Sequence, residues 1–297
     1  MKIKHFIMIS TMLIILVSCS SNIKDPLAGG EMMFWEVSDD DSSVYLLGSI
    51  HFGKADFYPL PDVVEQAYQN SETLGVEVNL LSVNQNDIQQ EMMQNMFYQD
   101  GSKLLDHLSP ETSQLLSEYL QEKSMDIAMF GNMKPGSLIL TISALEAQAA
   151  GLDPQYGIDM HYLVRAREDK KAITEFESLE SQMAMMFGDD ELAEGMLYNT
   201  LKEAADFKVM MDSLSTIWQA GDAQAMNEML TTWDTPEEKI YLENLFGERD
   251  VEMTKRIEEM LADNTQGFVI LGAGHFVNDE GIIRRLAEKD KYRIIKF

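Results

Sequence analysis

Two short stretches of this 297-residue chain carry histidines in matched surroundings. Residues 44–53 read Val-Tyr-Leu-Leu-Gly-Ser-Ile-His-Phe-Gly, and residues 268–277 read Phe-Val-Ile-Leu-Gly-Ala-Gly-His-Phe-Val. Both are apolar runs that end in Leu-Gly, pass two residues and reach His-Phe, at His51 and His275. An apolar run closed by glycine predicts a buried strand, so each histidine is expected just past a strand's carboxyl end.

Ligands bind at the carboxyl ends of strands in open α/β sheets, which makes this position chemically informative. Gly48 and Gly272 would allow the sharp chain exit or the close backbone approach that such an edge needs. If the two strands are neighbours, His51 and His275 are expected to meet there and to ligate a metal or exchange protons. The alternative is two ordinary structural histidines, which the matched pair makes the weaker interpretation.

Carboxylates also fall near predicted strand ends. A strand over 73–78 would place Glu77 and Asn79 on one side, and a strand over 171–176 ends beside Glu177. A carboxylate within an apolar strand is costly unless it is paired or ligating. The alternative for Glu77 is an edge strand that leaves it in water.

The composition limits the partners. The chain has 23 Lys and Arg against 50 Asp and Glu, a net charge of −27, which argues against nucleic acid or an anionic membrane surface as a partner. Hydrophobic residues make up 45% of the chain, which argues for a folded protein.

The amino terminus has the features of a lipoprotein signal peptide. Residues 1–18 carry two lysines and then an apolar segment too short to span a bilayer. The segment ends Leu-Val-Ser-Cys, which resembles the bacterial lipobox, and Cys19 is the only cysteine. We therefore expect lipidation at Cys19, a tether over 19–31 and a location in the bacterial cell envelope, with the lipid as the only membrane anchor.

The remaining residues, 32–297, predict a single α/β domain with a mixed central sheet and long helical insertions at about 83–151 and 189–263. Of the 22 methionines, 17 lie between residues 81 and 264. Such methionines either fill the helical core or form an adaptable peptide groove, and helical spacing favours the core.

These motifs, in this order, resemble the TraB/GumN family over nearly all of the chain from Met33. The stretches that carry the resemblance are Leu-Gly-Ser-Ile-His-Phe-Gly-Lys at 47–54, residues 57–61, Val-Glu-Val-Asn at 76–79, Gly-Ile-Asp at 157–159, Phe-Glu-Ser at 176–178 with Gln182, and Gly-Ala-Gly-His at 272–275 with Gly281 and Ile282. The chain departs from the family pattern at Phe176 and Ser178, where Leu and Thr are expected.

The family is similar to the Tiki proteases, which are membrane-tethered and metal-dependent, and its wider fold group includes erythromycin-esterase-like enzymes and haem-binding lipoproteins. The resemblance implies a mixed α/β core with paired Gly-x-x-His motifs. It also implies that His51, Glu77 and His275 form a centre for a divalent metal such as Mn, Co or Zn. The resemblance implies Asp159, Glu177, Gln182 and Arg249 as supporting or substrate-orienting groups. We also expect Glu177 and Arg249 to take part in catalysis, and Gly48, Gly272 and Asn79 to support the site.

The predicted function is that of a membrane-tethered, metal-dependent hydrolase, specifically a peptidase that acts on an exported peptide or protein. Glu177 or Glu77 would serve as general base and Arg249 would bind a developing oxyanion. The alternative for Arg249, which stands between two acids, is a surface helix charge. Two other functions remain open: a metal-free esterase-like hydrolase with a histidine as base, and a lipoprotein that binds haem or another small ligand.

Overall fold

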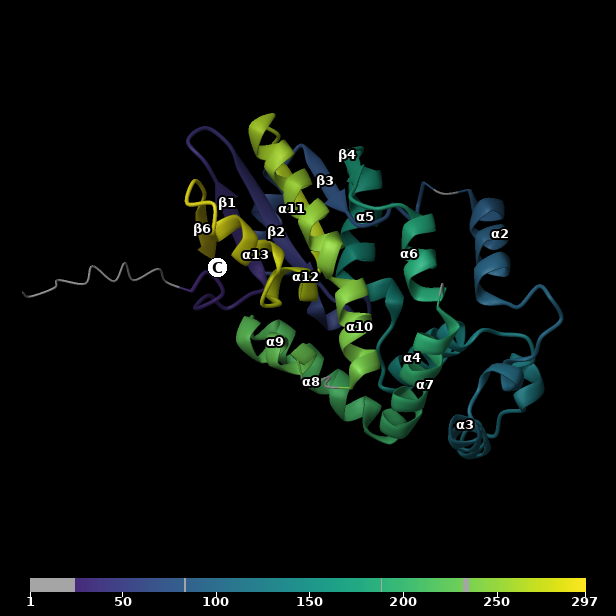
Figure 1. The fold of residues 1–297 in the computed structure, drawn as a ribbon. Helices are drawn as coiled ribbons and strands as arrows, with labels where there is room; N and C mark the ends of the chain where they lie inside the picture. The colour runs from purple at the N-terminus through teal and green to yellow at the C-terminus, as the bar shows by residue number, and fades with distance from the viewer. Residues whose placement is uncertain (1–24, 83, 188, 232–234) are drawn as a thin grey trace, which may run out of the picture.

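The computed structural model describes residues 25–82, 84–187, 189–231 and 235–297, and Figure 1 shows the fold. The expected signal peptide, Cys19 and the first part of the tether lie outside the described residues. A six-stranded sheet has the order β4-β3-β5-β2-β1-β6. Its strands are β1 (Phe34–Ser38), β2 (Ser43–Ser49), β3 (Thr73–Val76), β4 (Ala172–Glu175), β5 (Gly267–Gly272) and β6 (Arg293–Lys296).

The sheet is mixed, as expected from the sequence. Strands β4, β3, β5 and β2 run parallel, and β1 pairs antiparallel with both β2 and β6. The prediction of an α/β fold with a mixed central sheet is therefore confirmed.

Strand β5 enters the sheet between β2 and β3, although it comes about two hundred residues later in the chain. Ser49 of β2 lies opposite Gly272, and Val76 of β3 lies opposite Ile270. The carboxyl ends of these three parallel strands therefore meet at one edge. The two Leu-Gly pairs are offset by one residue in this register, because Gly48 faces Leu271 rather than Gly272.

Helices cover both faces of the sheet. On one face α1 (Asp62–Asn70) and α5 (Ile158–Asp169) bring the rings of Tyr68 and Tyr162 against Phe268 of β5. On the other face lie α11 (Gly247–Ala262), α12 (Ala273–Val277) and α13 (Ile282–Ala287), visible in front of the sheet in Figure 1. A strand covered on both faces must be apolar throughout, which explains the continuous run in β5.

The other helices form a helical region, mainly at the right and bottom of Figure 1. They are α2 (Gln85–Met96), α3 (Pro110–Glu122), α4 (Pro135–Ala149), α6 (Leu179–Phe187), α7 (Asp190–Glu203), α8 (Phe207–Gln219), α9 (Ala223–Thr231) and α10 (Pro236–Leu245), with short 3-10 helices at Ala55–Phe57, Leu104–His107, Ile127–Phe130, Pro154–Tyr156 and Ala204–Asp206. Buried Leu116, Leu138 and Leu197 belong to an apolar cluster of this region, whereas Trp218 of α8 and Met226 of α9 belong to the cluster around the sheet. None of the described helices is long and apolar enough to cross a membrane.

Candidate functional site

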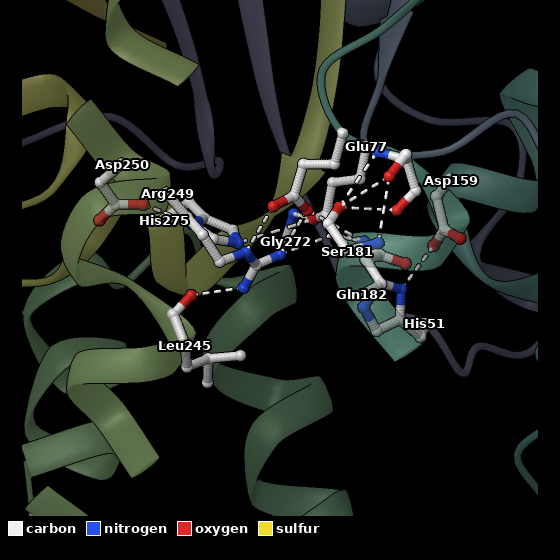
Figure 2. Close-up of polar contacts among 12 residues, drawn as sticks. His51, Glu77, Asp159, Ser181, Gln182, Leu245, Arg249, Asp250, Gly272 and His275 are labelled. Atoms are coloured by element: carbon white, nitrogen blue, oxygen red, sulfur yellow. Dashed lines mark hydrogen bonds and ion pairs between the residues drawn. The ribbon is translucent and has the colours of Figure 1, made fainter. Parts of the chain in front are cut away.

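The carboxylate of Glu77 lies at the centre of a polar cluster on the carboxyl edge of the sheet (Figure 2). The expected strand over 73–78 is two residues too long: β3 ends at Val76, so Glu77 follows the strand instead of lying within it. Its Oε1 accepts a hydrogen bond from the backbone N–H of Gly272 at 2.7 Å, and its Oε2 accepts one from Gln182 Nε2 at 2.9 Å. These bonds satisfy a side chain that is only 14% exposed, which removes most of the cost of burying it.

His275 lies in α12, the short helix that starts directly after β5, and it is buried. Its Nδ1 is 2.5 Å from Oδ1 of Asp250, an aspartate that is 1% exposed, and its Nε2 is 3.8 Å from Glu77 Oε1. Burial raises the pKa of Asp250, and the hydrogen bond and charge of His275 oppose that rise. A carboxylate on Nδ1 fixes the orientation of the imidazole and turns Nε2 toward the cluster.

His51 follows β2 in an irregular loop, and its side chain is 62% exposed. Its Nδ1 lies 3.2 Å from Oδ1 of Asp159 in the first turn of α5. The negative charge of Asp159 raises the pKa of His51 to about 9, with a smaller contribution from Glu77. His51 therefore holds a proton at neutral pH in the arrangement described.

Arg249 is 15% exposed and lies inside the cluster, so the alternative of a surface helix charge is wrong. Its Nε and Nη2 donate to the two oxygens of Glu177, both at 2.6 Å, and Nη2 is 3.5 Å from Glu77 Oε2. Burial alone would raise the pKa of Glu177, but the hydrogen bonds and charge of Arg249 outweigh it and keep that pKa low. Gln182 bridges the two glutamates through Nε2, which lies 3.1 Å from Glu177 Oε2.

Two carboxylate–imidazole pairs thus stand at opposite ends of the cluster in Figure 2, with Glu77 and Gln182 between them. In each pair the carboxylate holds Nδ1, which is the usual support for a histidine that ligates a metal through Nε2. Two imidazoles and one carboxylate also form a donor set that suits a catalytic divalent metal. The donor chemistry fits a metal, although no three His, Cys, Asp or Glu side chains of the described part of the chain converge into a ready-made metal site.

A small cavity of about 100 Å³ opens among His51, Glu77, Asp159 and Gln182. Ser49 at the end of β2 also lines it, and its buried Oγ has no hydrogen-bond partner among the described residues. A cavity of this size has room for a few water molecules or one small polar group, at roughly 30 Å³ per water.

The structure separates the predicted site residues into two sets. The polar cluster brings together most of them: His51, Glu77, Asp159, Glu177, Gln182, Arg249, His275 and the N–H of Gly272. Gly48 instead packs beneath Ala273. The side chain of Asn79 accepts a hydrogen bond from Leu81 N–H in a local turn, outside the cluster.

Sequence reasoning missed Asp250 and Ser49 as members of the site. Asp250 precedes Met253, Ile257 and Met260 at helical spacing, so it falls on the buried stripe of α11. An acid on an apolar stripe is a recognisable signal of a buried partner. Ser49 gave no comparable signal, because serine next to a strand end is common.

Comparison with known proteins finds one matching family model and several proteins of similar sequence. The model of the TraB/PrgY/gumN family matches residues 33–293. The chain is similar to the uncharacterized protein YbaP of Escherichia coli K12, with 25% identity over 66% of this chain and 71% of YbaP. It is also similar to an uncharacterized protein of Treponema pallidum, with 22% identity over 85% of this chain and 79% of that protein. No solved structure matches it significantly.

Proposed function

The chain belongs to the TraB/PrgY/gumN family, and from this premise and the geometry of the site we propose that it is a metal-dependent hydrolase of the cell envelope. Its substrate would be an exported peptide or protein. The metal would be a divalent cation such as Mn, Co or Zn, held by His51, Glu77 and His275.

One observation carries this proposal: the two imidazoles of the paired motifs each have Nδ1 held by a carboxylate and flank a third carboxylate, Glu77. A metal bound there would supply a water of lowered pKa and polarise the scissile carbonyl. Because His51 carries a proton at neutral pH, it must lose that proton before it can ligate a cation. Metal affinity is therefore expected to rise with pH up to about 9.

The other charged groups have distinct roles in this proposal. Both oxygens of Glu177 are occupied by Arg249, so Glu177 is a poor general base and instead orients the guanidinium. Arg249 would stabilise negative charge that develops on a carbonyl oxygen. Glu77 accepts its hydrogen bonds from two neutral donors, Gly272 N–H and Gln182, instead of a guanidinium, so it is the better candidate to accept a proton from water.

A thermal-shift series with manganese, cobalt and zinc tests the metal site. The wild type should be stabilised by metal, because only the folded site binds it, whereas His51→Ala, Glu77→Ala and His275→Ala should lose most of the shift. His107→Ala is the matched control, since His107 lies in the 3-10 helix over Leu104–His107, away from the cluster. Equal shifts in all five proteins would rule out this metal site.

Hydrolysis is tested separately with a mixture of peptides analysed by mass spectrometry. Wild-type protein with metal should cleave some of the peptides, and His275→Ala should cleave none. Cleavage at equal rates by both proteins would exclude the cluster as the reaction centre.

The proposed membrane tether rests on the Leu-Val-Ser-Cys sequence that ends at Cys19. Wild-type protein should enter the detergent phase of a Triton X-114 extraction, and Cys19→Ala should remain uncleaved or soluble. Wild type in the aqueous phase would contradict lipid anchoring.

A metal-free hydrolase is the second candidate, and one observation favours it. Arg249 already supplies a cation to both Glu177 and Glu77, so these carboxylates have a charged partner without a metal. In that case His275 would be the base that activates water, because His51 already holds a proton at neutral pH. Full cleavage after removal of metal with EDTA would select this candidate.

A further inference from the structure

A second cavity, of about 250 Å³, lies in the helical region, where α4, α6, α7, α8 and α10 surround it. Apolar side chains dominate its lining, and they include Ile139, Met185, Met186, Met196, Phe207 and Met210. Leu140, one of the lining residues, is 42% exposed, so the cavity opens to solvent and a side chain of a bound molecule can enter it.

Helix α6 connects this cavity to the polar cluster. Gln182, which donates to Glu77 and Glu177, lies in its first turn, and Met185 and Met186 follow three and four residues later. Residues at these spacings lie on the same face of a helix. At 1.5 Å per residue, the two methionines are only about 4.5 to 6 Å further along the axis than Gln182.

Helix α10 makes the same connection from the other side. Arg249 of the polar cluster donates to the backbone oxygen of Leu245, the last residue of α10. Tyr241, one turn earlier in α10, lines the cavity, and the charge of Arg249 opposes the burial that raises the pKa of Tyr241. Figure 1 shows α10 leading from the start of α11 toward α7 and α8. The cavity is thus about one helical turn from the polar cluster on two independent elements.

We propose that this methionine-lined cavity is a specificity pocket that takes one neutral, apolar side chain of the peptide substrate, of the size of methionine, leucine or phenylalanine. The inference rests on the proposed function, because it needs a peptide at the polar cluster. One extended peptide residue spans about 3.5 Å, so a side chain one or two residues from the scissile bond reaches this distance.

The size of the cavity and its mostly apolar lining favour an apolar side chain, and its charge disfavours an acidic one. An apolar cavity of about 150 Å³ holds a benzene molecule, so 250 Å³ accommodates a branched or aromatic side chain. Asp189, Glu203 and Glu238 are the charged residues of the lining, and no Lys or Arg of the described chain is among them. Glu238 is buried and hydrogen-bonded to Asn199 at 3.0 Å. An acidic side chain would meet like charge there, so the cavity disfavours acidic residues.

The first test measures binding without catalysis. The probes are N-acetyl-L-methioninamide, N-acetyl-L-leucinamide and N-acetyl-L-glutamic acid amide, and the readout is the ¹³C-methyl NMR signals of Met185, Met186, Met196 and Met210. The two apolar probes should shift these signals in the wild type, and the acidic probe should not. Ala193→Leu, which adds an isopropyl group to the cavity wall, should weaken binding about tenfold or more because the space is filled.

Ala144→Leu is the matched control. Ala144 is exposed on α4 and does not line the cavity, so the same chemical change should leave binding unaltered. Met196→Ala, which enlarges the cavity, should shift the preference toward N-acetyl-L-phenylalaninamide, and this variant provides the test if Ala193→Leu does not fold. Equal binding of the acidic probe, or methyl signals that do not respond to any probe, would overturn the proposal.

The cleavage assay then separates this inference from the proposed function. If wild-type protein cleaves peptides, the residue preference next to the bond should be apolar and should change in Ala193→Leu but not in Ala144→Leu. An unchanged preference in Ala193→Leu would overturn the specificity pocket and leave the hydrolase intact. Probe binding in the cavity with no cleavage of any peptide would reject the hydrolase and leave a pocket for apolar peptide side chains.

Discussion

The two Gly-x-x-His motifs are nearly alike in sequence and quite different in structure. After β5 the chain turns at once into α12, and His275 is buried with Asp250 as its partner. After β2 the chain continues as an irregular loop, and His51 is 62% exposed with Asp159 as its partner. A shared motif therefore fixes where each histidine enters the site, and the surroundings fix how each one behaves.

The neighbours of each motif explain the difference. Both β5 and β2 lie in the middle of the sheet, but the chain after β5 forms α12, which packs against α9 and α13 and thereby keeps His275 buried. The loop after β2 instead crosses to the helical region, where Gly53 forms an isolated bridge with Asp153. His275 is thereby suited to be a fixed ligand or base, and His51 to bind and release a proton.

Loss of Asp250, the buried partner of His275, should have the largest effect on the free energy of unfolding. Asp250→Ala would leave the buried Nδ1 of His275 without its acceptor and remove one of the two acceptors of Asn278 Nδ2, at a cost of roughly 3 kcal/mol. Asp159→Ala removes the partner of a ring that is 62% exposed, where water screens the ion pair, and should cost less than Asp250→Ala. Urea unfolding followed by circular dichroism measures both values. Equal losses in the two variants would mean that the two motifs are energetically equivalent.

Substitutions at the two motif glycines, Gly48 and Gly272, should affect the stability of the fold and the binding of metal to different extents. A Cβ on Gly48 would lie 3.1 Å from the Cα and the Cβ of Ala273, so Gly48→Ala should destabilise the fold by about 1 to 3 kcal/mol through overpacking. A Cβ on Gly272 would meet the end of the Glu77 side chain at 3.3 Å, which can move aside. Gly272→Ala should therefore reduce metal binding more than stability, as measured by urea unfolding and by metal thermal shifts. The reverse pattern would contradict this assignment.

Substitution of Trp218 should have a smaller effect on the free energy of unfolding, and its local effect should be confined to the His51 motif. Its indole Nε1 donates to the backbone oxygen of Gly48 at 2.7 Å, and its ring stacks on Phe57. Trp218→Phe keeps the ring contact but loses the hydrogen bond, at a cost of about 1 kcal/mol in urea unfolding. The imidazole NMR signals of His51 should shift in this variant. Trp35→Phe, which loses an indole bond to Pro26 elsewhere, should leave them unchanged.

The effect of pH on stability should be smaller than the shift in pKa alone would suggest, because water screens the exposed pair of His51 and Asp159. The folded-state pKa of His51 is about 9, above the ordinary histidine value of 6.5, so the contribution of its ion pair to stability is complete below pH 6.5 and is lost as pH rises to about 9. In Asp159→Asn the pKa of His51 should fall toward 6.5 and this part of the pH dependence should disappear. An NMR titration of the imidazole, with urea unfolding at pH 6 and pH 9, measures both. A wild-type pKa near 6.5 would show that Asp159 does not hold the proton on His51.

Much of the candidate site could be predicted because it lies at strand ends. The runs before His51 and His275 predicted two strands, and the residues that resemble the TraB/GumN pattern include Asp159, Glu177 and Gln182, which the structure brings to one cluster. The cavity among α4, α6, α7, α8 and α10 could not be predicted, because a methionine that lines a cavity has the same helical spacing as one that fills a core.

The sequence by itself determined the fold class, the family and the placement of two histidines beyond apolar strands, because hydrophobic patterning and short motifs are local properties of the chain. Only the tertiary structure decided that β5 enters between β2 and β3, that Arg249 binds Glu177, and that Asp250 rather than a nearby residue supports His275. The physical reason is that these pairings join residues from 25 to about two hundred positions apart. Their partners are selected by the register of the sheet and the packing of helices on it, and no short stretch of sequence encodes either.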